Sequence, residues 1–172
     1  MKKIVIPFIT FLLFVGFVSC TGPQGPQGTN GQDGLLSQVY EISNVNFVAS
    51  GFSVLYNFST PIYASDHVLI YRLAGTTTLG ADIWKPLPET YFFPDGTLDF
   101  SYNFNFSKND FQIYLDGNNL QTVTDAYRLG QVFRIVVVPG VFVNKMNSTT
   151  PTSYNELIKK YNIDESKIIQ LK

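Results

Sequence analysis

Apolar and polar residues alternate along most of the chain after residue 36. The alternation is most regular in LDFSYNFNFS at 98–107, where Leu98, Phe100, Tyr102, Phe104 and Phe106 are separated by Asp, Ser and Asn. Successive side chains of a strand point to opposite faces, so a period of two is typical of a half-buried strand. We therefore expect 98–107 to be a strand, with the stripe from Phe100 to Phe106 in the core.

The same alternation, together with the continuous apolar runs HVLIYRL and QVFRIVVVPG, predicts several further strands. They are expected at 39–48, 51–59, 67–73, 108–117 and 131–140, with two short strands in 81–93 that Pro86 and Pro88 separate. Turn sequences, such as Pro94-Asp95-Gly96 and Asp116-Gly117, lie between them. Residues 121–130 predict an irregular connection with one helical turn.

The pattern changes near the C-terminus. Ser153 and Glu156 form a capping box, which predicts a helix with apolar positions at 154, 157, 158 and 161. Asp164 is expected to cap a second short helix that carries Ile168 and Ile169. We expect these helices to cover an open end or a sheet edge.

Short strands with turns at intervals of roughly 8–12 residues are typical of an antiparallel β-sandwich. Residues 36–172 are therefore predicted to form a mostly β domain, an immunoglobulin-like or jelly-roll-like sandwich with short C-terminal helices. A β-barrel is the alternative.

The N-terminal segment is typical of a lipoprotein signal peptide at residues 1–19. Met1-Lys2-Lys3 is basic, residues 4–18 are almost wholly apolar, and Val18-Ser19-Cys20 resembles a lipobox. The apolar run is shorter than the about 20 residues that a membrane span needs. Cys20 is predicted to carry acyl chains after cleavage; the alternative is an ordinary secretory signal with a chance cysteine.

Cys20 is also the one cysteine of the chain, so no intrachain disulfide can form. A lone thiol in an exported protein would invite intermolecular pairing, whereas acylation removes that thiol. Acyl chains bind firmly to a membrane when more than one is present. The cysteine count and the lipobox thus predict the same membrane attachment.

Glycine recurs at every third position from Gly22 to Gly34, directly after this cysteine. Collagen requires that spacing, but this tract is short, polar and poor in proline. Residues 20–35 are therefore expected to be a flexible tether between the lipid anchor and the domain. A short triple-helical stalk under a trimeric head is the alternative, so the oligomeric state stays open.

The net charge of the chain and its few candidate reactive residues limit the classes of function that we expect. Removal of Lys2 and Lys3 from the 12 basic residues leaves 10 against 13 acidic residues, which disfavours nucleic-acid binding. His67 is the one histidine, and its neighbour Asp66 falls on the opposite strand face. The Asp residues near turns, including Asp95, are assigned to turn formation. No catalytic residue, cofactor or metal site is predicted, and we expect no enzyme activity.

Exposed aromatic side chains give the binding hypothesis, because sugar rings stack on the faces of Trp and Tyr. Trp84, Tyr91, Tyr63 and Tyr127 lie in or beside expected loops. Carbohydrate binding would require Trp84 and at least one of the tyrosines on a common patch.

The lipobox, the Gly-Pro-Gln tract and four segments together resemble a family of small Bacteroidota lipoproteins with a collagen-like tract. The segments are VLIYRL, DIWKPLPETYFF, LDFSYNFNFSKNDFQIYLDG and VFRIVVVPG. The resemblance implies a lipid-anchored outer-membrane protein and implies no activity. We therefore expect a non-catalytic binding or structural module with a glycan or an envelope protein as partner, on either face of that membrane.

Overall fold

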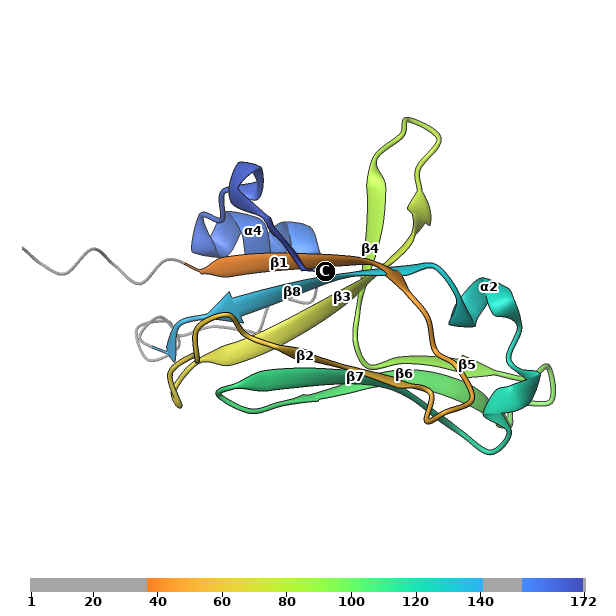
Figure 1. Cartoon of the computed structure of the whole chain (residues 1–172). Helices are drawn as coiled ribbons and strands as arrows, with labels where there is room; N and C mark the ends of the chain where they lie inside the picture. Colours follow the sequence, from red (N-terminus) through yellow and green to blue (C-terminus); the bar gives the residue numbers. More distant parts are fainter. Residues whose placement is uncertain (1–36, 141–152, 172) are drawn as a thin grey trace, which may run out of the picture. The chain divides into compact units, whose positions relative to one another are not determined.

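The computed structural model describes residues 37–140 and 153–171, which form two β-sheets packed face to face (Figure 1). The five-stranded sheet has the order β4-β3-β8-β1-β9 and the four-stranded sheet the order β2-β7-β6-β5. The two sheets share no strand and do not close on each other, which confirms the predicted β-sandwich. The predicted signal peptide, Cys20 and the glycine tract lie outside the described residues.

The strands agree closely with the alternation in the sequence. Those of the five-stranded sheet are β1 (Gln38–Val45), β3 (His67–Thr76), β4 (Asp82–Pro86), β8 (Gln131–Val138) and β9 (Ile169–Leu171). Those of the four-stranded sheet are β2 (Ser53–Asn57), β5 (Glu89–Phe92), β6 (Leu98–Phe106) and β7 (Asp110–Gly117). Neighbouring strands are antiparallel, except that β9 pairs with β1 in the parallel direction.

The core between the sheets contains the apolar stripe of β6 in part. Phe100 and Tyr102 are fully buried, and the Tyr102 ring centre lies 6.0 Å from that of Phe133 in β8. Leu98 and Phe106, in contrast, are exposed because they lie at the two ends of the strand, beside the hairpin turns. The expectation that the stripe from Phe100 to Phe106 lies in the core is therefore wrong at Phe106.

Strands β4 and β5 follow each other in the sequence but belong to opposite sheets. Leu87 and Pro88 connect them, and the buried Leu87 enters the core between the sheets. Proline cannot donate a hydrogen bond to a neighbouring strand, so β4 ends at Pro86 and β5 begins only after Pro88. This crossing joins the two sheets near the site described below.

Helix α4 (Tyr154–Tyr161) lies on the outer face of the five-stranded sheet (Figure 1). The Ser153 side chain accepts a hydrogen bond from the backbone N–H of Glu156 at 3.3 Å, as the capping box predicts. Leu157 packs there with Val136 and Val138 of β8. The expectation that the helix covers an end or an edge is wrong, because β8 is apolar on both faces and needs cover on each.

The last residues also differ from the expectation. Asp164 caps a 3₁₀ turn, η2 (Glu165–Lys167), through a hydrogen bond from Ser166 N at 3.1 Å. Ile168 and Ile169 do not continue that turn as a helix, since Ile169 begins β9 and pairs with Tyr40 of β1.

The connection from β7 to β8 contains η1 (Leu120–Thr122) and one helical turn, α2 (Asp125–Arg128), as predicted. Across 37–140 and 153–171, the helices are all too short or too polar to span a lipid bilayer.

Candidate functional site

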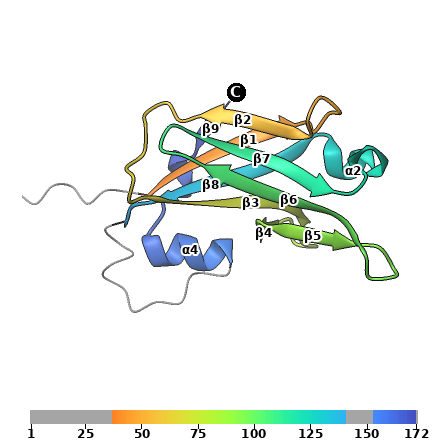
Figure 2. The same ribbon diagram turned by 90° about the horizontal axis from the view of Figure 1, so that it is seen from below.

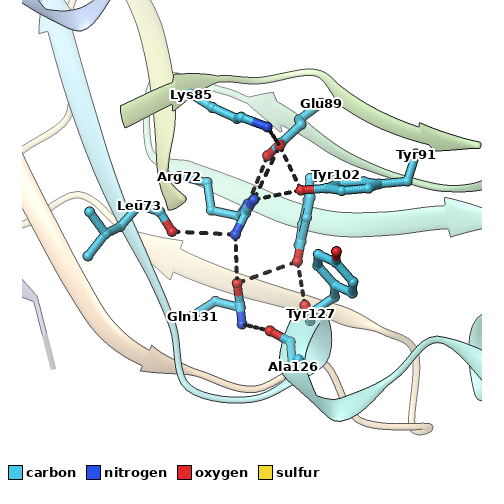
Figure 3. Close-up of polar contacts among 9 residues, drawn as sticks. All are labelled: Arg72, Leu73, Lys85, Glu89, Tyr91, Tyr102, Ala126, Tyr127 and Gln131. Atoms are coloured by element: carbon cyan, nitrogen blue, oxygen red, sulfur yellow. Dashed lines mark hydrogen bonds and ion pairs between the residues drawn. The ribbon is translucent and has the colours of Figure 1, made fainter. Parts of the chain in front are cut away.

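Arg72 is a charged residue buried between the two sheets, with 6% of its surface exposed. Its neighbour Tyr71 points to α4, so alternation along β3 directs Arg72 to the opposite, inner face. A buried guanidinium is stable only when it is paired and hydrogen-bonded. Glu89 of β5, 9% exposed, provides the pair from the other sheet. The Arg72 Nε–Glu89 Oε2 distance is 2.8 Å and the Nη2–Oε1 distance 3.2 Å, a two-point contact (Figure 3).

The rest of the Arg72 guanidinium also has partners. Nη1 donates to Gln131 Oε1 at 3.2 Å, and Nη2 donates to the Tyr91 hydroxyl at 2.7 Å. The guanidinium carbon lies 4.9 Å from the centre of the Tyr102 ring, a distance suited to a cation–π contact. Arg72 therefore connects residues of four strands around one buried charge.

Gln131 and Tyr102 extend this network to the turn α2 (Figure 3). Gln131 Nε2 donates to the carbonyl oxygens of Ala126 at 2.9 Å and Leu129 at 2.8 Å. The Tyr102 hydroxyl donates to the carbonyl oxygen of Tyr127. The network thus fixes the connection that closes this end of the sandwich.

The charges of the network are set by competing effects. Burial alone raises the pKa of Glu89, but hydrogen bonds from Arg72, Tyr91 and Lys85 outweigh it and hold that pKa below its usual value. Burial raises the pKa of Tyr91, as does its hydrogen bond to Glu89 at 2.7 Å. Glu89 is therefore ionised and Tyr91 protonated near neutral pH, an arrangement that favours a fixed ion pair over proton transfer.

Tyr91 and Tyr127 form an aromatic pair at the outer edge of this network. The Tyr91 ring stacks on the buried Phe100 ring, with centres 4.7 Å apart and planes at 8°. The Tyr127 ring centre lies 4.8 Å from that of Tyr91, and Tyr127 is 37% exposed. The half-exposed Lys85 closes the edge with its Nζ 3.0 Å from Glu89 Oε1. These side chains could contact a ligand with a ring face and hydroxyl groups.

No protein-family model, curated protein or solved structure matches this chain.

Trp84 does not lie with Tyr91 and Tyr127. It is on the outer face of the five-stranded sheet, where its ring centre is 5.7 Å from that of Tyr154 in α4. The Arg134 guanidinium carbon lies 4.2 Å from the centre of the Trp84 ring, and Arg134 is itself paired with Glu41 at 2.8 Å. Trp84 thus packs between a helix and the partly buried Arg134.

Tyr63 belongs to a third location, the loop between β2 and β3. It is exposed and lines a pocket of about 250 Å³ with Gln38, Ile62 and Asp66. Of the four aromatic residues selected from the sequence, the structure brings Tyr91 and Tyr127 together and separates Trp84 and Tyr63 from them. Trp84 therefore shares no common patch with Tyr63, Tyr91 or Tyr127.

The sequence reasoning missed Arg72, Glu89, Gln131 and Tyr102 as a polar network. One signal was available, because Arg72 interrupts the otherwise apolar run HVLIYRL and a charge inside a central strand requires a partner. Within 37–140 and 153–171, no three His, Cys, Asp or Glu side chains come close enough to hold a metal ion.

Proposed function

We propose that this protein is a lipid-anchored protein of the outer membrane whose β-sandwich is a non-catalytic binding module on a short tether. The observation that carries the proposal is the lipobox, Val18-Ser19-Cys20, directly after an apolar run. The Gly-x-y tract that follows Cys20 supports a spacer between the lipid and the domain.

The buried network supports the non-catalytic part of the proposal. Both Glu89 carboxylate oxygens accept hydrogen bonds from Arg72, and one is also paired with Lys85. A carboxylate held in this way is a poor general base, because protonation would cost these interactions. The network instead suits a rigid scaffold for a surface that binds without reacting.

Acyl labelling tests the anchor. Cells that express the full chain are grown with a tagged fatty acid, and the protein is then isolated by denaturing electrophoresis. We expect label on the wild type and none on Cys20→Ala, because the thiol is the acylation site. Ser153→Ala is the matched control, since it keeps Cys20 and should be labelled. Label on Cys20→Ala would overturn the proposal.

Membrane fractionation and protease treatment of intact cells test the location. We expect the protein in the outer-membrane fraction; recovery in the inner-membrane or soluble fraction would contradict the proposal. Degradation by protease in intact cells would direct the search for a partner to the cell surface. Protection until the outer membrane is permeabilised would direct it to the periplasm.

A further inference from the structure

The outer faces of the two sheets differ in what covers them. Helix α4 lies on the five-stranded sheet, over the apolar side chains of Val39, Tyr71 and Val136. Figure 2 looks onto the four-stranded sheet, and no described helix or strand crosses its outer face. This open face consists of the residues that alternate with the buried side chains of β2, β5, β6 and β7.

The central part of the open face is formed by paired positions on β2, β7 and β6. Tyr114 of β7 lies between Ser53 and Asn103, and Gln112 lies between Leu55 and Asn105. In the next row, Ser101 lies between Thr90 of β5 and Asp116 of β7. A half-buried tyrosine is thus surrounded by amides, hydroxyls and a carboxylate.

This composition is unusual for the solvent side of a sheet. Asn and Asp are disfavoured in strands, yet Asn103, Asn105, Asp110 and Asp116 occupy outward positions of the two central strands. None of β2, β5, β6 and β7 contains lysine or arginine, the residues that commonly protect exposed strands. Departures from local strand preference of this kind tend to mark functional surfaces.

Hydrogen bonds within the face hold its amides in place and leave part of their capacity free. Asn103 Nδ2 donates to Ser101 Oγ at 2.8 Å, and Asn105 Nδ2 donates to Gln112 Oε1 at 3.3 Å. In the described part of the chain, Asn103 Oδ1, Gln112 Nε2 and the Tyr114 hydroxyl have no protein partner. The face therefore presents both donors and acceptors around one aromatic ring.

We propose that this face binds a neutral carbohydrate chain, with Tyr114 as the stacking residue and Asn103 and Gln112 as hydrogen-bonding residues. The strands of this face carry carboxylates and no lysine or arginine, so the face repels nucleic acids, acidic polysaccharides and phosphate groups. An aromatic ring beside amide donors and acceptors suits an uncharged ring that carries hydroxyls. The apolar side of a sugar ring can lie on Tyr114, while sugar hydroxyls replace water on the amides. From Gln112 to Asp116 the face extends about 14 Å along β7, enough for a short oligosaccharide.

The inference names the ligand class of the proposed binding module and so rests on that function. Its test is affinity electrophoresis of the full-length acylated protein in a neutral detergent. The gels contain soluble β-glucan, xylan, galactomannan or dextran, with polygalacturonate as the anionic comparison. The variants are Tyr114→Ala and Gln112→Ala, and the matched control is Gln170→Ala, an exposed amide on β9 of the other sheet.

We expect at least one neutral polysaccharide to retard the wild type and Gln170→Ala equally. Tyr114→Ala and Gln112→Ala should each weaken the apparent affinity about tenfold or more, as the loss of a central contact does. Thermal unfolding of each variant checks that it is folded. If Tyr114→Ala does not fold, Gln112→Ala alone tests whether this face binds the polysaccharide. No retardation by any of the four neutral polysaccharides, equal retardation of the variants, or retardation by polygalacturonate alone would overturn the inference. Each of these results leaves the acyl-labelling and fractionation tests of the proposed function unaffected.

Discussion

Replacement of Arg72 by methionine tests whether the buried ion pair holds the two sheets together. Arg72→Met keeps most of the side-chain volume but leaves the Glu89 carboxylate, 9% exposed, without its main partner. Removal of one partner from a buried pair costs about 3–5 kcal/mol. Glu89 keeps contacts with Lys85 at 3.0 Å and Tyr91 at 2.7 Å, so we expect about 3 kcal/mol at neutral pH. The melting temperature should fall by about 10 °C.

The pH dependence of this cost gives a sharper test. In the wild type the pKa of Glu89 is lowered, so its stabilising effect is present above the pKa of an unfolded glutamate, about 4.3, and is lost as pH falls through the lower folded pKa. Without Arg72, burial becomes dominant and the pKa of Glu89 should rise above the unfolded value. The cost of Arg72→Met should therefore be largest near pH 7 and shrink towards pH 4.

Trp84 provides the assay, since it is the one tryptophan of the chain and lies outside the network. Its fluorescence can follow urea unfolding of the wild type, Arg72→Met and the double variant Arg72→Met/Glu89→Leu at pH 7 and pH 4. The double variant, which buries no charge, should recover much of the lost free energy. A cost below about 1 kcal/mol at pH 7, or an equal cost at both pH values, would refute the reasoning.

Four further substitutions test other parts of the fold by the same unfolding assay. Leu157→Ala empties a fully buried position under α4 and should cost about 2–5 kcal/mol, with faster hydrogen exchange in the helix. Gly117→Ala places a methyl group 2.6 Å from the Asp99 carbonyl oxygen and should cost about 1–3 kcal/mol. Tyr154→Phe removes the hydroxyl that accepts from Arg134 and donates to Glu165 and should cost about 1 kcal/mol. Leu79→Ala, at a hairpin position 95% exposed, should change stability by less than about 0.5 kcal/mol.

The two Leu→Ala substitutions remove the same atoms, so their costs should differ through burial alone. Equal effects of Leu157→Ala and Leu79→Ala would contradict the packing of α4 on the sheet. A neutral Gly117→Ala would mean that β6 and β7 can separate locally at no measurable cost.

The strands could be predicted from the sequence because their pattern is local. The alternation from Phe100 to Phe104 and the proline pair at 86 and 88 both correspond to features of the structure. Strand β9 could not be found in this way, since three residues give no readable period and its partner β1 lies far away in the sequence. The same limit applies to α4, because its place on a sheet face depends on which strand faces need cover.

The candidate site could be predicted from the sequence less well than the strands. Arg72 was visible as a charge within an apolar strand, but its partner Glu89 comes from the other sheet, after the crossing through Leu87. Trp84, Tyr63, Tyr91 and Tyr127 are all expected in or beside loops from the sequence. Proximity to loops does not separate Tyr91 and Tyr127, which lie together, from Trp84, which packs against α4 on the outer face of the five-stranded sheet.

The position of β1 has a mechanical consequence for a protein held by its N-terminus. The described chain enters the domain at the first residues of β1, which is an inner strand paired with β8 on one side and with β9 on the other. A pull on the N-terminal segment therefore acts along the strand and loads its hydrogen bonds to both neighbours together. Peeling of an edge strand would instead break such bonds one after another. In the proposed anchored protein, tension would therefore enter the domain through a strand that is paired on both sides.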